Sequence, residues 1–264
     1  MDTDKPLSSF AKLVLVGAGA LAVVAGPILY LFPNDTGTYF AWTIQHPLTP
    51  VFMGASYFAG IGNLIAVKEN RWSLARVQLP AIIAFTLTML LATLLHIPIF
   101  NSSHPVAWAW LGVYVISPWA AVLVMLQGER GYHPTEIKAQ KLPSAFTPVM
   151  YALAFITGAL GLFLFLAPEQ AASFWAWSLT PLTGRVVGGW YLSSVALQLM
   201  LARQTSLQTA RVGLLANVLV TSLLLLGALL HFENLNGPVA SVWLYLLLNL
   251  ALGAFSLYSW IKSN

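Results

Sequence analysis

The chain has 264 residues, of which 58% are apolar and only 8% are charged. Soluble domains carry about 25% charged residues, so a water-soluble protein of this size would lack the charge to cover its surface. Disordered chains are poor in apolar residues and rich in charge, so disorder is excluded as well. Cysteine is absent, which excludes disulfides, thiolate metal sites and cysteine nucleophiles. The composition predicts a polytopic membrane protein.

A membrane-spanning helix needs about 20 mostly apolar residues, and eight stretches of the chain meet this requirement. The leucine run at 223–226 lacks the alternation of a membrane β-strand. The predicted fold class is therefore all-α, a polytopic membrane protein with eight transmembrane helices at 11–32, 48–67, 78–99, 106–126, 146–167, 184–201, 211–230 and 238–260.

Basic residues are distributed unevenly between the two sides of these spans. All of the 12 Lys and Arg residues except Arg185 fall on the side that holds the N-terminus. Short loops rich in Lys and Arg stay in the cytoplasm, so both termini are predicted to be cytoplasmic. The basic rim, which includes Arg76 and Arg211, is expected to contact anionic membrane lipids.

An internal duplication organises the chain. At a shift of 135 residues, 74–96 and 209–231 are identical at 11 of 23 positions. Each unit contains four spans, an even number, so the two units form a tandem parallel repeat, related by an approximate two-fold axis along the membrane normal. The predicted division is a first four-helix repeat at 1–126, a cytoplasmic linker at 127–145 and a second four-helix repeat at 146–264.

Small residues and prolines predict how the spans pack. Gly26 ends a stripe of small residues at fourfold spacing, and Gly184 and Gly188 repeat that spacing, which is typical of close helix packing. Pro27 and Pro118 lie inside spans of the first unit and have no proline counterparts in the second. Because proline loosens or kinks a helix, the first unit is expected to be more bent, which makes room for a cavity.

Polar residues inside the spans are of the weaker kind. No Asp, Glu or Lys lies deep in a span, which counts against a proton-coupled transporter or a cation channel. The remaining polar residues either bond across helices or line a pocket for a neutral ligand: Asn63, Thr86, Thr93, Ser194, Gln198, Asn217, Thr221 and Asn249.

The outer side gathers the residues with the most chemistry. His96 and His231 end corresponding spans of the two units, where an imidazole can cap a helix C-terminus, bind a metal or haem, or serve another ligand. The candidate ligand-binding cluster comprises Arg185, Glu169, Glu233, His96, His231 and His104.

Arg185 is the one basic residue on this side, near the start of its span. An arginine there needs an anion, supplied by Glu169, Glu233, a lipid headgroup or a ligand carboxylate. The two outer loops at 33–47 and 168–181 are each expected to form a short helix along the interface. Their tryptophans are expected to form an aromatic belt at headgroup depth: Trp42, Trp175 and Trp177.

Two short motifs carry a family resemblance. The segment Phe-Ala-Trp-Thr-Ile at 40–44 is followed by Pro-Leu-Thr at 47–49, and Leu-Leu-His stands at 94–96. This pattern resembles an uncharacterised family of bacterial multi-pass membrane proteins. The resemblance implies a bacterial inner (plasma) membrane location and assigns no activity.

The leading interpretation is a non-enzymatic membrane protein that acts by binding. It holds a lipid-like or small ligand, or partner helices of other membrane subunits in a larger complex. A haem- or metal-binding redox protein using the outer histidines is one alternative, and a facilitative small-molecule transporter is another. No nucleotide-binding or nucleic-acid-binding motif occurs, so nucleic acid is not an expected partner.

Overall fold

The computed structural model describes residues 4–133 and 140–262. Within these ranges the chain is helical and contains no β-strand. Lys138 and the middle of the predicted linker, 134–139, lie outside the described residues.

The helices follow the same order twice along the chain. The first series is α1 (Ser9–Leu31), α2 (Thr36–Tyr39), α3 (Leu48–Tyr57), which continues through a 3₁₀ turn (Phe58–Gly60) into α4 (Ile61–Glu69), α5 (Trp72–Leu95) and α6 (Pro105–Glu129). The second series is α7 (Phe146–Leu166), α8 (Pro168–Phe174), α9 (Pro181–Ala202), α10 (Leu207–Leu230) and α11 (Val239–Lys262). A short 3₁₀ helix follows α5 at Ile97–Ile99, and another follows α10 at Phe232–Asn234.

Local sequence signals explain where the helices begin and end. The Ser8 hydroxyl accepts the Ala11 N–H at 3.1 Å and caps α1. Thr180 and Thr183 form a reciprocal capping box at the start of α9. The predicted span 78–99 is wrong at its end, because α5 stops at Leu95. Pro98 disfavours the helical conformation at the residue before it.

Seven helical segments of the described chain are long and apolar enough to cross a membrane. They are α1, α3 together with α4, α5, α6, α7, α10 and α11, which indicates a multi-pass membrane protein. The remaining long helix, α9, has 22 residues but is less apolar, with Arg185, Ser193, Ser194 and Gln198 among them.

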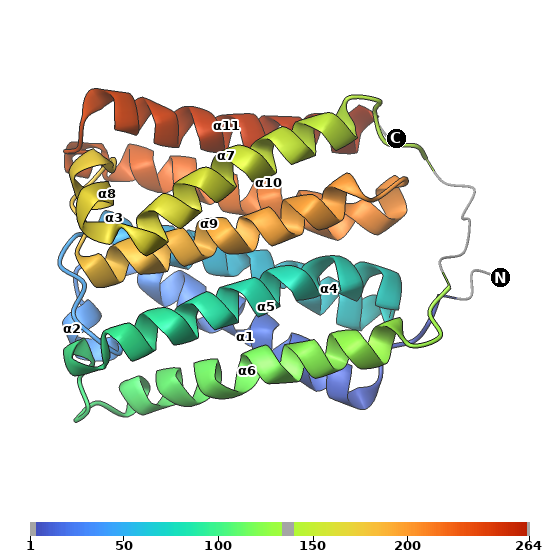
Figure 1. The fold of residues 1–264 in the computed structure, drawn as a ribbon, viewed down its shortest axis with the longest axis horizontal. Helices are drawn as coiled ribbons and strands as arrows, with labels where there is room; N and C mark the ends of the chain where they lie inside the picture. Colours follow the sequence, from blue (N-terminus) through green and yellow to red (C-terminus); the bar gives the residue numbers. More distant parts are fainter. Residues whose placement is uncertain (1–3, 134–139, 263–264) are drawn as a thin grey trace.

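The long helices run along one direction, so the molecule has two distinct ends (Figure 1). At one end, called the basic end, lie the start of α1, the end of α11 and the described Lys and Arg residues other than Arg185. At the opposite end, called the histidine end, lie α2, α8 and both 3₁₀ helices that follow α5 and α10. His46, His96, His104 and His231 all belong to segments at this end.

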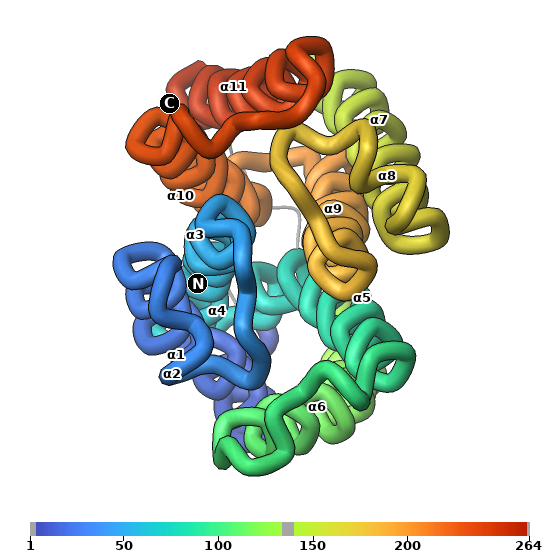
Figure 2. Tube along the Cα trace, turned by 90° about the vertical axis from the view of Figure 1, so that its left-hand side faces the viewer, coloured from blue at the N-terminus to red at the C-terminus, as the bar shows by residue number. Residues whose placement is uncertain are grey.

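Packing between the two series is reciprocal. The first-series helix α5 packs against the second-series helix α9, and α10 packs against α3 and α4. Within each series, α1 packs on α3 and α4 as α7 packs on α9, and α5 packs on α6 as α10 packs on α11. The helices α3, α4, α5, α9 and α10 therefore form the centre, while α1, α6, α7 and α11 lie at the edge (Figure 2).

Glycines allow the closest crossings in both series. A methyl group added at Gly54 of α3 would lie 2.7 Å from the carbonyl oxygen of Gly26 in α1. One added at Gly188 of α9 would lie 2.8 Å from the carbonyl oxygen of Gly161 in α7. Gly26 and Gly188 were expected to pack helices closely, and both do.

The loop tryptophans are not in an aromatic belt, so that prediction is wrong. Trp42, Trp175 and Trp177 are only 3%, 3% and 1% exposed. Trp42 meets Trp110 edge-on at 5.0 Å, and Trp177 meets Tyr245 edge-on at 5.2 Å. Each outer loop contains a short helix, α2 or α8, as predicted. These loops fold their aromatic rings inward between the helix ends, which buries more apolar area than the interface offers.

Ion pairs within the protein involve much of the basic end. Arg76 donates to both oxygens of Glu129 at 2.8 and 3.0 Å, and Arg211 pairs with Glu69. Arg71 pairs with Asp4 at 2.9 Å. The guanidinium groups of Arg76 and Arg211, which were expected to contact lipid, are thus also bound by carboxylates of the chain.

Candidate functional site

The structure brings together two of the six predicted site residues. His96 terminates α5, and its Nε2 lies 2.7 Å from Nη1 of Arg185 in the second turn of α9. Since an arginine only donates, the imidazole accepts and is neutral. Loss of hydration and the neighbouring Arg185 charge both lower the pKa of His96. The Nε of Arg185 is buried and has no partner among the described residues.

The other four predicted residues lie apart from this pair. The Nε2 of His104 is 3.1 Å from the Thr38 carbonyl oxygen, and its Nδ1 accepts the Val106 N–H at the start of α6. His231 is the residue that ends α10. Glu169 and Glu233 are exposed on short helices, and neither forms an ion pair with Arg185 in the described chain.

A metal site has little support at the histidine end. Within residues 4–133 and 140–262, no three His, Cys, Asp or Glu side chains gather where they could hold a metal ion. The Nε2 of His96 faces a guanidinium, and a metal cation there would meet the Arg185 charge at close range. The geometry favours an arginine–imidazole pair.

The more developed candidate site is a cavity inside the first series of helices. It has a volume of about 630 Å³, which is within the range typical of small-molecule pockets. Its walls come from α1, the α3–α4 segment, α5 and α6, and α9 of the second series contributes Trp190 and Ser193. This cavity is called the large cavity below.

The wall of the large cavity is mostly apolar, with a few polar groups on the central helices. Asn63 and Gln78 are each only 3% exposed. The Asn63 Oδ1, the Gln78 Nε2 and the Trp190 Nε1 are buried and find no hydrogen-bond partner in the described chain. Buried polar groups are normally paired, so unpaired atoms in the wall of a cavity indicate a place where a ligand or water supplies the missing partner.

Aromatic side chains hold this wall rigid. The indole of Trp190 stacks on Phe85 with ring centres 3.9 Å apart and meets Tyr57 edge-on at 5.0 Å. The hydroxyls of Tyr57 and Tyr114 lie 2.9 Å apart and satisfy each other across the cavity wall. The polar atoms of the site are therefore carried by fixed side chains, which lowers the ordering cost of binding.

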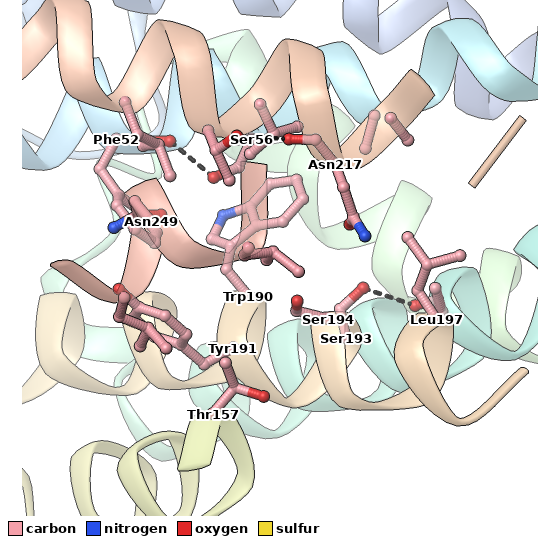
Figure 3. A pocket seen from close by; sticks show the side chains of 18 of the residues that line it. Phe52, Ser56, Thr157, Trp190, Tyr191, Ser193, Ser194, Leu197, Asn217 and Asn249 are labelled. Atoms are coloured by element: carbon pink, nitrogen blue, oxygen red, sulfur yellow. Dashed lines mark hydrogen bonds between the residues drawn. The ribbon is translucent and has the colours of Figure 1, made fainter. Parts of the chain in front are cut away.

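A second, smaller cavity of about 90 Å³ lies on the other side of Trp190. Figure 3 shows Trp190 reaching from α9 between Ser56 of α3 and Asn249 of α11, while Tyr191 lies beside it. The two cavities share several wall residues: Ser56, Ala59, Gln78, Ala81, Trp190 and Ser193. Trp190 and Gln78 thus form part of a common partition.

Sequence reasoning identified part of this site. A cavity in the first unit was expected from its extra prolines, and Asn63 and Thr86, predicted as possible pocket residues, line it. Gln78, Trp190 and the Tyr57–Tyr114 pair were missed. Gln78 stood at the very start of a predicted span, and Trp190 comes from the opposite unit. A signal for Trp190 was its position opposite Ser56 in the alignment of the repeats.

Comparisons with protein-family models, with curated proteins and with solved structures found no match to this chain.

Proposed function

We propose that the protein is a membrane protein built from two parallel four-helix units, with eight spans and both termini in the cytoplasm. The reciprocal packing of α5 on α9 and of α10 on α3 and α4 supports a two-fold relation. The helix α9 counts as the eighth span because neighbouring helices cover much of it, so it needs little apolar surface toward lipid.

We infer that its function is to bind a small, lipid-like neutral molecule in the large cavity. One observation carries this inference: a volume of about 630 Å³ with an apolar wall contains the unpaired, buried atoms Asn63 Oδ1 and Gln78 Nε2. A cavity kept only for packing reasons would cost stability, in proportion to its volume. Unpaired polar atoms would cost more. A bound molecule offsets both costs.

Extraction of the protein from its membrane in mild detergent, followed by mass spectrometry of co-purifying small molecules, tests this function. We expect a stoichiometric neutral lipid-like molecule with the native protein. The matched variant Gln78→Leu should lose it, whereas Asn249→Leu, a similar change in the small cavity, should retain it. A native protein that carries no such molecule, and whose melting temperature responds to no added neutral amphiphile, would refute the proposal.

Cysteine labelling tests the eight-span topology, and the chain has no native cysteine to interfere. Single cysteines in place of Lys68, at the basic end, and Glu233, at the histidine end, are exposed to a membrane-impermeant maleimide in intact cells. We expect labelling at position 233 and none at 68. Labelling at both positions, or only at 68, would contradict the proposed orientation.

A further inference from the structure

We propose that the large cavity takes an uncharged single-chain amphiphile directly from the bilayer, through an opening between α1 and α6 beside Gly17 and Gly112. The inference rests on the proposed function of the cavity. It adds the chemical class of the ligand and the route by which the ligand arrives.

The position of the opening follows from residues that both line the cavity and face outward. Leu13 of α1 and Ile116 of α6 line the large cavity, yet they are 70% and 67% exposed. A side chain can meet both conditions only where the cavity reaches the surface. Both helices lie at the edge of the molecule (Figure 2), so in a membrane this opening faces lipid.

The two helices are joined at their ends and separate between them. At the basic end, Lys5, just before α1, donates to the carbonyl oxygens of Gln127 and Gly128 of α6 at 3.2 and 2.8 Å. At the histidine end, His104 lies 3.1 Å from the carbonyl oxygen of Thr38 in α2. Anchored at both ends, α1 and α6 frame the opening as a slot.

Glycines lie in the middle of this slot. A methyl group added at Gly17 or at Gly112 would have no neighbouring atom within 4 Å. Most other glycines in the helices approach a neighbouring helix closely, as Gly54 approaches Gly26. Gly17 and Gly112 therefore do not serve close packing in this conformation. They leave the slot free of side chains at the level of the cavity.

The wall chemistry selects an uncharged ligand. None of the described residues that line the large cavity is an Asp, Glu, Lys, Arg or His. A charged headgroup would lose its hydration there with no opposite charge to compensate, which is strongly unfavourable. An uncharged head with a hydroxyl and a carbonyl matches the wall, because it donates to Asn63 Oδ1 and accepts from Gln78 Nε2.

The distribution of polarity also fixes the direction of the ligand. The polar residues Ser56, Asn63 and Gln78 come from α3, α4 and α5, on the central side of the cavity. The contribution of α1 is apolar apart from small residues, with Phe10, Leu13 and Leu21 among them. The head therefore lies inward and the chain extends toward the slot and the lipid.

A pair of photoreactive probes tests the ligand class. Both carry the same diazirine-bearing 16-carbon chain. One ends in a glycerol ester and the other in a phosphate. We expect the uncharged probe to label cavity peptides at least about tenfold more than the phosphate probe, the factor that one lost polar interaction produces. Gln78→Leu should reduce labelling by the uncharged probe severalfold, and Asn249→Leu should leave it unchanged.

A single cysteine at position 17 tests the route. Cysteine fits there because no atom lies near an added side chain. Attachment of a bulky maleimide to Gly17→Cys before the uncharged probe is added should slow its uptake at least about tenfold. Attachment afterwards should trap the bound probe. Val24→Cys, on an exposed part of α1 outside the cavity wall, should do neither when modified.

The outcomes separate the two levels of the proposal. If neither probe labels the cavity, the proposed binding function fails. If the phosphate probe labels as strongly as the glycerol ester, the binding function stands and the assignment of an uncharged head is wrong. If modified Gly17→Cys exchanges the probe as fast as modified Val24→Cys, the slot between α1 and α6 is not the route.

Discussion

The two series of helices differ most in the space that they enclose. The large cavity of the first series has about 630 Å³, and its counterpart in the second has about 90 Å³. Positions shifted by 135 residues line both: Val113, Tyr114 and Ser117 in the first, and Leu248, Asn249 and Leu252 in the second. The same framework is therefore filled in one half and hollow in the other.

Particular side chains account for the difference. Gly112, Ser117 and Ala120 line the large cavity, and 135 residues later stand Leu247, Leu252 and Phe255. Phe255 stacks with Phe146 at the start of α7, with ring centres 6.2 Å apart. Large apolar residues thus occupy the volume that small residues leave free on α6.

Helix spacing acts in the same direction. Any side chain at Gly253 of α11 would collide with Thr221 of α10, so these two helices are in close contact. At the corresponding position α6 carries Pro118, whose ring prevents such an approach and which has no N–H to complete the helix. A repeat thus acquires a binding site on one side by a few substitutions that hold the outer helix away.

The largest expected effect concerns the glycine crossings, where the two halves should behave alike. Gly54→Leu and Gly188→Leu each place a side chain against backbone, 2.7 and 2.8 Å from a carbonyl oxygen. Backbone in the middle of a helix moves little, so we expect each variant to lose at least about 3 kcal/mol of stability, at the upper end of overpacking costs. Thermal unfolding in detergent followed by size-exclusion chromatography measures this loss.

Gly112→Ala serves as the control for that experiment, because it adds a methyl group in open space. It should change the unfolding temperature little. A severe effect of Gly54→Leu beside a mild one of Gly188→Leu would show that the two crossings are not equivalent, and the comparison between the halves would fail at its centre.

The next prediction converts one half into the other. The triple variant Gly112→Leu, Ser117→Leu and Ala120→Phe gives α6 the side chains of α11. It should abolish binding of an uncharged amphiphile, with at least a tenfold rise in the dissociation constant, since the cavity is filled. If the filling fits, the ligand-free protein should melt at a higher temperature, because filled cavities stabilise. Unchanged binding would place the ligand elsewhere.

Sequence alone predicted the framework of both halves but not their contents. The apolar spans, the repeat and the small-residue crossings follow from spacing and identity, which depend on residues close along the chain. The burial of Trp42 and Trp177, and the insertion of Trp190 of α9 into the wall of the first unit, depend on which helices become neighbours. That choice arises from long-range packing, and the period of a single helix does not encode it.

The candidate site shows the same limit. Arg185 was correctly singled out as needing a polar partner, but both glutamates considered for it lie elsewhere. The partner His96 approaches because α5 and α9, from different units, pack together. Spacing in the sequence does not report a contact across a two-fold interface.

The ion pairs of the basic end offer a smaller test. Glu129 accepts from Arg76 and also from the indole of Trp72 at 3.1 Å, whereas Glu69 pairs with Arg211. These groups are partly exposed, so each pair contributes little, on the order of 1 kcal/mol. We expect Glu129→Gln to lower the unfolding temperature more than Glu69→Gln. An equal or reversed effect, measured at low and at high salt, would remove this distinction between the halves.

The smallest effect distinguishes the two histidines that end α5 and α10. The pKa of His96 is lowered from its ordinary value by loss of hydration and by the Arg185 charge, so the unfolded chain binds a proton more readily than the folded one. The stabilising contribution of neutral His96 is complete above about pH 6.5 and is lost as the pH falls toward the lower pKa of the folded state.

We therefore expect the melting temperature to fall between pH 7.5 and 5.5, and His96→Gln to reduce that fall by less than about 1 kcal/mol in equivalent stability. Glutamine keeps an acceptor for Arg185 and does not titrate. His231→Gln, at the corresponding helix end without an arginine partner in the described chain, should leave the slope unchanged. Part of the slope should persist in both variants, because burial also lowers the pKa of His46. If His231→Gln flattens the pH profile as much as His96→Gln does, the Arg185 contact is not what sets the two ends apart.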